Sequence, residues 1–415
     1  MVAASKTISL SSGKDNTRNM KNKLLILLFP GIWCFLISGC TVKWTEAIQY
    51  GEVEQEEFRA TVPIEIQKDL ILVPVSIQGK SYRFLFDSGA PFSISDRLQR
   101  EFGFKTVSRG TIVDSDHNRK KVNWVQVDAI DIGGISFREQ TAFVGDFAAN
   151  PILGCIGIDG IIGSNLIRHS NWIIDQEQGA LSLFSTIDQE ALNAYAIVLF
   201  ETDYQYNIFL DVDLGSATVG KVLLDYGSNG SVSLSRDIFS RLKDRGIIRE
   251  TLSEKGVRQT GIIGTSVPLD REIAFTDSLR MDRLQPEDVM LRTGKTVSIG
   301  NKLLSRFRVT IDWENQVLYM EPGGKTRDPA RSRGFSLGYA VDKGIYVQSV
   351  IENSKADRAG IRPNMQVLKI DGLDFANGND YCDYVQHELS DEFFIQLIDA
   401  QGQHLELRLE NTVLK

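Results

Sequence analysis

Two aspartates, Asp87 and Asp225, each stand where an apolar segment runs into a glycine-containing turn. Asp87 lies in YRFLFDSGAPFSIS, residues 82–95, and Asp225 lies in KVLLDYGSNGSVSLS, residues 221–235. Two carboxylates held a few ångströms apart cannot both ionise at low cost, so such a pair shares one proton and titrates in two coupled steps. One member then serves as a base to a water molecule while the other protonates a carbonyl oxygen. This acid–base chemistry requires neither a metal nor a cofactor, and the sequence predicts none.

An internal repeat places the two aspartates in equivalent positions. IIGSNLIRHSNWIIDQEQGALSLF, residues 161–184, matches SIGNKLLSRFRVTIDWENQVLYME, residues 298–321, at an offset of 137 without a gap. Asp87 and Asp225 are 138 residues apart. Fixed-period similarity of this kind indicates a duplicated structural unit. We expect residues 60–185 and 195–322 to superpose about a pseudo-twofold axis between the two turns.

Each unit reads as a strand, an Asp-x-Gly turn, a second strand and a short helix. Ser95 and Ser235 precede the apolar residues of one helical face and are predicted N-caps. Hairpins are predicted around residues 110–127 and 261–272. The charged segment 113–122 is expected to be a solvated hairpin tip, which gives His117 no catalytic part. Trp124 at its base is expected in the core, with a place beside a bound substrate as the alternative.

The segments FLFDSGA, residues 84–90, and GIIG, residues 160–163, resemble the signature of retropepsin and pepsin-type aspartic proteases. The resemblance covers residues 60 to 322. It implies a mainly β fold in which two β-barrel lobes enclose an active-site cleft. It also implies that Asp87 and Asp225 form a catalytic dyad around one water and hydrolyse peptide bonds, with a polypeptide as the substrate. Ser88 and Gly89 complete the first turn, and Tyr226 and Gly227 stand at the matching positions of the second.

Tyr226 departs from the family pattern. A small hydroxyl residue after each aspartate bonds to the opposite turn in that family, and Ser88 is able to do so. Tyr226 has no room there unless its ring lies elsewhere, so Tyr226→Thr is expected to preserve or raise activity. The alternative interpretation is a catalytically degenerate envelope protein that binds peptides. A serine protease is excluded because the serine–glycine cluster at 227–231 has no plausible His and Asp partners.

The amino-terminal segment has the three parts of a secretory signal peptide. A basic stretch after Met20 is followed by the apolar run LLILLFPGIWCFLI and by Ser-Gly-Cys, which ends at Cys40. This ending resembles a bacterial lipobox, which implies that residues 1–39 are removed and that Cys40 is lipidated. Met20 is a candidate for the true start. We therefore expect a lipid anchor in the cell envelope. Since Thr41 rather than Asp follows Cys40, we expect that anchor on the bacterial outer membrane.

The carboxyl-terminal region resembles a PDZ domain. The resemblance rests on SKADRAGI, residues 354–361, and VLKIDG, residues 367–372. Ser354 is the predicted cap of the short helix, and Gly360 its stop. The resemblance implies that a peptide is received beside Gly334, Phe335, Ser336 and Leu337. The alternative is a domain that docks on the rest of the chain and binds no separate peptide.

Composition sets the remaining expectations. The 415 residues carry 46 basic and 54 acidic side chains, a net charge of -8, and no basic run that would favour a nucleic-acid partner. The four histidines are scattered, which gives no metal site. Cys34 would be lost and Cys40 lipidated; Cys155 and Cys382 fall in different expected domains, so no disulfide is expected.

The expected domain division is a signal peptide at 1–39, a first lobe at 41–190, a second lobe at 191–322, a linker at 323–329 and a PDZ domain at 330–412.

The lipobox hypothesis predicts that Cys40→Ser releases the protein from the membrane. Without the cysteine thiol no acyl chain can be attached, and apolar burial in the bilayer is lost. The measurement is fatty-acid labelling together with membrane fractionation of cells. A variant that stays labelled would show that Cys40 is not the acylated residue.

Overall fold

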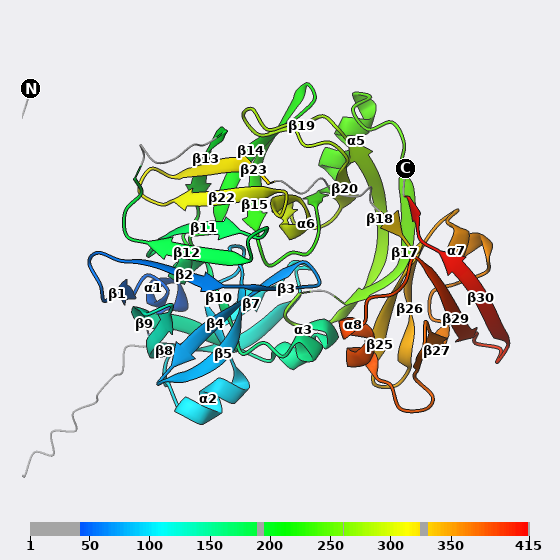
Figure 1. Ribbon diagram of the computed structural model, residues 1–415, viewed down its shortest axis with the longest axis horizontal. Coiled ribbons are helices and arrows are strands. Elements are labelled where there is room, and N and C mark those ends of the chain that lie inside the picture. Colours follow the sequence, from blue (N-terminus) through cyan, green and yellow to red (C-terminus); the bar gives the residue numbers. More distant parts are fainter. Residues whose placement is uncertain (1–41, 189–194, 260, 324–330, 414–415) are drawn as a thin grey trace, which may run out of the picture. The chain divides into compact units, whose positions relative to one another are not determined.

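Short segments of alternating burial account for a mainly β architecture, as the sequence predicts (Figure 1). The computed structural model describes residues 42–188, 195–259, 261–323 and 331–413. The expected signal peptide, Cys40 and most of the expected linker lie outside these ranges. Within them, no helix has the length and apolar character needed to cross a membrane.

The first half of the chain folds into one sheet around Asp87. Strand β5 (Lys80–Phe86) pairs antiparallel with β4 (Leu70–Ile77) and parallel with β10 (Gly160–Ile162). The sheet continues from β10 through β6 (Ser93–Ser95), β9 (Ile135–Gly145), β8 (Arg119–Ile132) and β7 (Lys105–Val113). The last two strands form the hairpin predicted around residues 110–127.

The second half repeats this order and sense of pairing around Asp225. Strand β15 (Ala217–Asp225) pairs antiparallel with β14 (Ile208–Leu214) and parallel with β21 (Ser298–Gly300). The sheet continues through β16 (Val232–Leu234), β20 (Val289–Thr293), β18 (Ser266–Thr276) and β17 (Leu252–Gln259). Strands β17 and β18 form the second predicted hairpin. Asp87 and Asp225 therefore stand at the same point of two sheets that are paired alike.

A third set of strands joins the two halves. Strands β11 (Asn171–Asp175) and β22 (Phe307–Asp312) pair antiparallel at its centre. The order on either side is again alike: β12 (Ala180–Phe184) and β2 (Arg59–Pro63) on one, β23 (Val317–Pro322) and β13 (Ala196–Thr202) on the other. One hydrophobic core runs across both halves, from Val62 and Phe86 to Ile299 and Met320. The two halves cannot separate without exposing this core.

In each half a short helix follows the strand that comes after the Asp-x-Gly turn, which is β6 in the first half and β16 in the second. Ser95 caps α2 (Asp96–Phe102) by accepting from the Leu98 amide, and Ser235 caps α5 (Arg236–Asp244) by accepting from the Ile238 amide. Both predicted caps are confirmed. The shorter helices and strands are α1 (Trp44–Ala47), β1 (Glu52–Val53), β3 (Glu65–Gln67), a 3-10 turn (Phe147–Ala149), α3 (Pro151–Ile156), α4 (Ser164–Ile167), β19 (Leu279–Arg280) and α6 (Asn301–Leu304).

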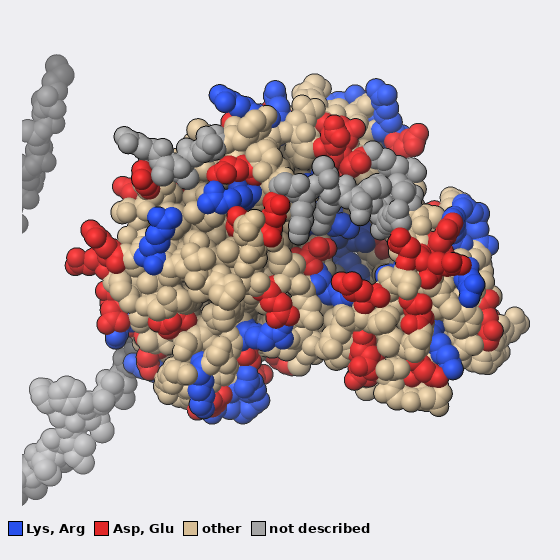
Figure 2. Space-filling view, viewed as in Figure 1, with Lys and Arg blue, Asp and Glu red and all other residues tan. Residues whose placement is uncertain are grey.

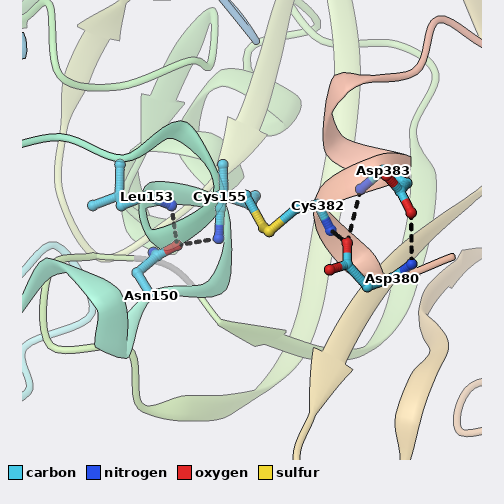
Figure 3. Close-up of a disulfide and its surroundings, with 7 residues drawn as sticks. Asn150, Leu153, Cys155, Asp380, Cys382 and Asp383 are labelled. Atoms are coloured by element: carbon cyan, nitrogen blue, oxygen red, sulfur yellow. Dashed lines mark hydrogen bonds between the residues drawn. A yellow bond between two sulfur atoms is a disulfide. The ribbon is translucent and has the colours of Figure 1, made fainter. Parts of the chain in front are cut away.

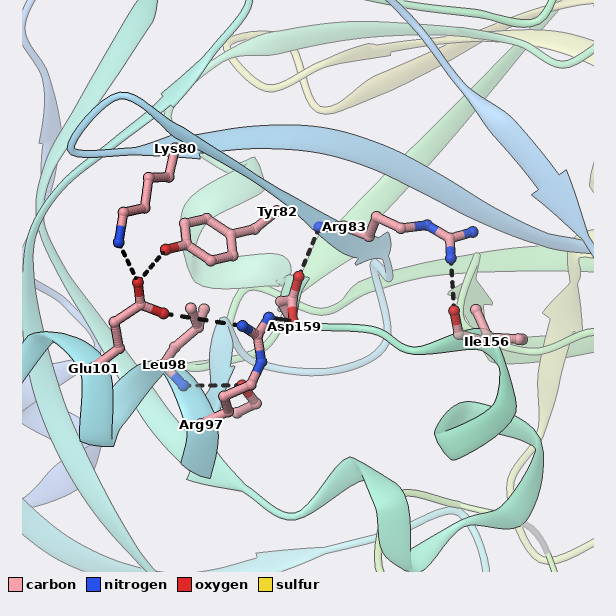
Figure 4. Close-up of polar contacts among 9 residues, drawn as sticks. Lys80, Tyr82, Arg83, Arg97, Leu98, Glu101, Ile156 and Asp159 are labelled. Atoms are coloured by element: carbon pink, nitrogen blue, oxygen red, sulfur yellow. Dashed lines mark hydrogen bonds and ion pairs between the residues drawn. The ribbon is translucent and has the colours of Figure 1, made fainter. Parts of the chain in front are cut away.

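A polar network joins α2 to β5, the strand that ends directly before Asp87 (Figure 4). Glu101 of α2 accepts hydrogen bonds from Lys80 and Tyr82 of β5, at 2.7 and 2.9 Å. Arg97 of α2 pairs with Asp159, whose carboxylate also accepts from the Arg83 amide of β5. Exposed ion pairs contribute only ~0–1 kcal/mol each to stability. Their effect here is to fix the position of β5 against α2.

Residues 331–413 form a smaller β unit with a core of its own, which includes Phe335, Val347, Ile370 and Phe393. Its main strands are β25 (Phe335–Ala340), β26 (Gly344–Ile351), β27 (Gln366–Ile370), β29 (Glu392–Ile398) and β30 (His404–Glu410). It also contains β24 (Arg331–Ser332), α7 (Lys355–Arg358), β28 (Leu373–Asp374), α8 (Tyr381–Gln386) and β31 (Thr412–Val413). Ser354 caps α7, as predicted. Strand β26 pairs with β17, so the sheet of the second half continues into this unit.

A disulfide joins Cys155 of α3 to Cys382 of α8 (Figure 3), and the expectation of no disulfide was wrong. That expectation assumed that two expected domains keep their cysteines apart. Instead α3 packs against α8, with Ile152 and Cys155 lying on the carboxyl-terminal core. Both helices are capped beside the bond: Asn150 accepts from the Ile152 and Leu153 amides, and Asp380 accepts from the Cys382 amide.

Breaking this disulfide is expected to destabilise the protein. The bond closes a loop across a separation of 227 residues, and removing a native disulfide costs about 2–5 kcal/mol. Cys155→Ser and Cys382→Ser should each lower the melting temperature, and the double variant should melt no lower than either. Thermal melts with and without a reductant test this. A wild-type melting temperature that does not respond to the reductant would contradict it.

Candidate active site

Asp87 is held by the backbone of two turns. Its amide donates to the carbonyl of Ile162 in β10 at 3.0 Å, which fixes the end of β5. Its carboxylate accepts from the Gly89 amide at 2.8 Å, and the Gly227 amide of the opposite turn lies near enough to lower its pKa. The residue is only 7% exposed. A buried carboxylate is tolerated because such backbone donors replace water.

Asp225 occupies the matching position at the end of β15 and faces Asp87. The Gly227 and Ser228 amides of its own turn lie near enough to its carboxylate to lower its pKa, and the Ser228 amide donates to the Asp225 backbone carbonyl at 3.2 Å. A Cβ atom at Gly227 would lie 2.2 Å from Cγ of Asp87, and one at Gly89 would lie 3.0 Å from Oδ1 of Asp225. Each glycine therefore leaves room for the carboxylate of the other turn. The structure therefore brings together the Asp87–Gly89 turn and the Asp225–Gly227 turn, which are 138 residues apart in sequence.

Burial raises the pKa of both carboxyl groups above the usual range. For Asp87 the backbone hydrogen bonds from Gly89 and Gly227 partly oppose the effect of burial. For Asp225 the charge of Asp87 raises the pKa further, and the nearby Arg292 guanidinium lowers it. The pair therefore retains a proton to higher pH than isolated carboxylates do.

The residues that follow the aspartates behave differently in the two turns. The Ser88 hydroxyl donates to the Leu224 carbonyl at 2.5 Å and accepts from the Tyr226 amide at 3.2 Å, so it bridges to the second turn. The Tyr226 ring is fully buried and lies edge-on to Phe86, with 5.6 Å between ring centroids. Its hydroxyl has no hydrogen-bond partner among the described residues. The ring fills the core, and the reciprocal side-chain bridge from the second turn is not made.

A cavity of about 540 Å³ opens beside the two aspartates. Trp124, Trp44, Tyr204 and Ile262 are among the residues that line it. Trp44 stacks on Trp124 at 5.0 Å between ring centroids. Trp124 is fully buried, as expected of a core residue, and it also borders the cavity. The cavity offers apolar surface next to the carboxylates, as peptide side chains require.

The tip of the β7–β8 hairpin borders this cavity, and it is solvated only in part. Val113, Ser115, His117 and residues 119–121 are exposed, as expected, whereas Asp114 and Asp116 are only 8% and 2% exposed. Asp116 pairs with Arg258 of β17, and its carbonyl accepts from Lys295 at 2.6 Å. His117, whose side chain is exposed, has positive φ. The sequence pattern showed the charges but not the partners that bury them.

Three arginines at the cavity were missed by the sequence analysis. Arg258 of β17, Arg271 of β18 and Arg292 of β20 line it together with the aspartates. Arg258 pairs with Asp116, and Arg271 pairs with Glu254 at 2.6 Å. An arginine within an otherwise apolar strand, as in VMLRT, was the available signal. In the described ranges, no cluster of three or more His, Cys, Asp or Glu residues could bind a metal.

The segment expected to receive a peptide in the carboxyl-terminal unit is engaged within the chain. The Gly334 amide donates to the Ser332 hydroxyl at 3.0 Å, and Phe335 and Leu337 are buried in the core. The Ser336 and Ser349 hydroxyls are 2.6 Å apart, and Ser349 in turn donates to Glu254. This chain of hydrogen bonds leads from Ser336 to Glu254, the partner of Arg271 at the cavity.

Comparison with known protein families gives one match for part of the chain. Residues 73–166 match the profile of a family described as aspartyl protease. The matched stretch runs from β4 to α4 and contains Asp87 and its turn. No curated protein matches the chain. The match supports an aspartyl protease domain of the retropepsin-like kind over these residues, as the sequence motifs indicated.

The buried Tyr226 gives a stability prediction. Tyr226→Phe removes a buried hydroxyl that lacks a partner, so it should leave the free energy of unfolding unchanged or raise it by about 1 kcal/mol. Tyr226→Thr should lower it by about 3 kcal/mol, because it leaves a cavity beside Phe86. Denaturant unfolding of the two variants measures both effects. A Phe variant that is strongly destabilised would mean that the hydroxyl is bonded after all.

Proposed function

We propose that this protein is an aspartic endopeptidase that hydrolyses peptide bonds with the Asp87/Asp225 pair. The observation that carries the proposal is the meeting of two shielded carboxylates beside a cavity, each packed against the glycine of the opposite turn. The equivalent strand pairing around each aspartate and the family match over residues 73–166 support a two-lobed protease of which these are the facing turns.

The shared proton defines two roles within the pair. The ionised aspartate takes a proton from the attacking water, while the protonated aspartate donates its proton to the scissile carbonyl oxygen. The attack yields a tetrahedral diol. The aspartate that took the water proton then gives it to the amide nitrogen, the other aspartate takes a proton from a diol hydroxyl, and the C–N bond breaks to release an amine and a carboxylic acid. The turn amides hold both carboxylates in place throughout, so little reorganisation is needed.

A second candidate is a protein that binds peptides without cutting them. Tyr226 favours it, because its ring lies in the core and the second turn lacks the reciprocal hydroxyl bridge. Small displacements of catalytic groups reduce rates strongly. Ser88 supports the protease instead, since its two hydrogen bonds still tie the turns together.

We further propose that the protein acts from a lipid anchor at Cys40 in the cell envelope. The carboxyl-terminal unit is proposed to be a PDZ domain that positions the protease. Its disulfide to α3 and its strand pairing with β17 favour docking on the rest of the chain over capture of a separate peptide.

Replacing either aspartate tests the protease proposal. Asp87→Asn and Asp225→Asn should each abolish cleavage of a broad peptide library, because a lone carboxylate cannot serve as both base and acid. The double variant should be no worse than either single one, and circular dichroism should show that all three fold. Full activity in Asp225→Asn would exclude catalysis by the Asp87/Asp225 pair. No cleavage by the wild type, with peptides still bound, would favour the binding protein.

The pH profile of the same assay is expected to be bell-shaped. Activity should fall at low pH as the ionised aspartate becomes protonated, and at high pH as the pair loses the shared proton. Since the pKa values of both groups are raised, the active window should lie above that of ordinary carboxyl groups, toward neutral pH.

A further inference from the structure

Arg292 combines two properties at the cavity: its side chain is shielded from solvent, and the charges of Asp225 and Glu254 act on it without a direct hydrogen bond or ion pair among the described residues. Its side chain enters the cavity from β20, close enough to Asp225 to lower the pKa of that carboxyl group. Within the described part of the chain, no hydrogen bond or ion pair joins its guanidinium to another residue. Arg258 and Arg271 are matched by Asp116 and Glu254, and Arg119 and Lys295 are exposed to solvent.

The position of the Arg292 guanidinium is fixed by its surroundings. A Cβ atom at Gly230 would lie 2.3 Å from Nη2 of Arg292, so the glycine leaves room for the guanidinium beside the second turn. Burial and the neighbouring charges of Arg271 and Arg258 lower the pKa of Arg292 to about 10, which leaves it charged at neutral pH. A shielded cation with unused donors attracts an anion more strongly than an exposed one does.

We propose that Arg292 binds a carboxylate of the substrate next to the scissile bond. The inference rests on the proposed function and names its substrate class: peptides with an Asp or Glu side chain, or with a free carboxyl terminus, close to the cleavage point. The planar guanidinium can bind a carboxylate through two parallel hydrogen bonds, which fixes the register of the peptide against Asp87 and Asp225. The apolar part of the cavity, around Trp44 and Trp124, remains for neighbouring side chains.

Paired peptide substrates test the proposal. Each pair differs only by Glu or Gln at one position, scanned over three residues on either side of the scissile bond, and each peptide is made with a free and an amidated carboxyl terminus. At one position, wild type should cleave the Glu peptide with kcat/KM at least tenfold above the Gln peptide. Arg292→Gln should reduce that ratio to about one, and Arg292→Lys should retain part of it.

A matched control separates this effect from loss of any positive charge. Arg280→Gln makes the same chemical change at an exposed arginine of β19, which pairs with Asp213 and does not line the cavity. It should keep the wild-type ratio. If Arg292 served only as a counter-charge to the aspartates, its Gln variant would shift the pH profile and leave the ratio unchanged.

Peptide binding to Asp87→Asn distinguishes failure of this inference from failure of the protease proposal. This variant retains Arg292, and Glu peptides should bind it at least tenfold tighter than Gln peptides by fluorescence polarisation. That preference without any wild-type cleavage would support the subsite and overturn the protease. A preference confined to free carboxyl termini would identify the terminal carboxylate as the ligand. Equal binding and cleavage of all pairs, or a preference that survives Arg292→Gln, would overturn the inference.

Discussion

The burial of two carboxylates at one point is the constraint on which the rest of the structure depends. Neither Asp87 nor Asp225 can be shielded unless backbone amides replace water, and the Gly227 amide lies near enough to both carboxylates to lower their pKa values. Each turn can supply these amides only if its strand ends opposite the other. The shared sheet of β11 and β22, and the core that runs across both halves, maintain this position. The Ser88 hydroxyl then fixes the turns to each other at short range.

The sequence predicted those features that depend on local chemistry or on repetition. Ser95 and Ser235 cap their helices because a serine before an apolar helical face satisfies a free amide. The hairpins followed from alternating patterns, and the repeat indicated that Asp87 and Asp225 occupy equivalent places. The resemblance of residues 84–90 to a protease signature agrees with the family match over residues 73–166. These signals are contained within short segments or arise from comparing one segment with another.

Features that depend on contacts between distant segments were missed. Nothing in the spacing of Cys155 and Cys382 indicates that α3 lies against α8. The burial of Asp116 in the β7–β8 hairpin tip was not expected, because the residues that bind it, Arg258 and Lys295, come from the second half. The role of Arg292 could not be predicted from its own strand, because it depends on Arg292 and Asp225 lining the same cavity. Tyr226 is different, because its ring was expected to lie away from the turn and does so, in the core beside Phe86.

The disulfide between α3 and α8 has a consequence for how the molecule responds to being cut. It joins residues 155 and 382, so a chain cleaved once anywhere between them remains a single covalent molecule. The two fragments would stay associated through the bond as well as through the shared core. Self-cleavage within that span would therefore leave the apparent mass unchanged on a gel run without reductant, and reduction alone would reveal two pieces.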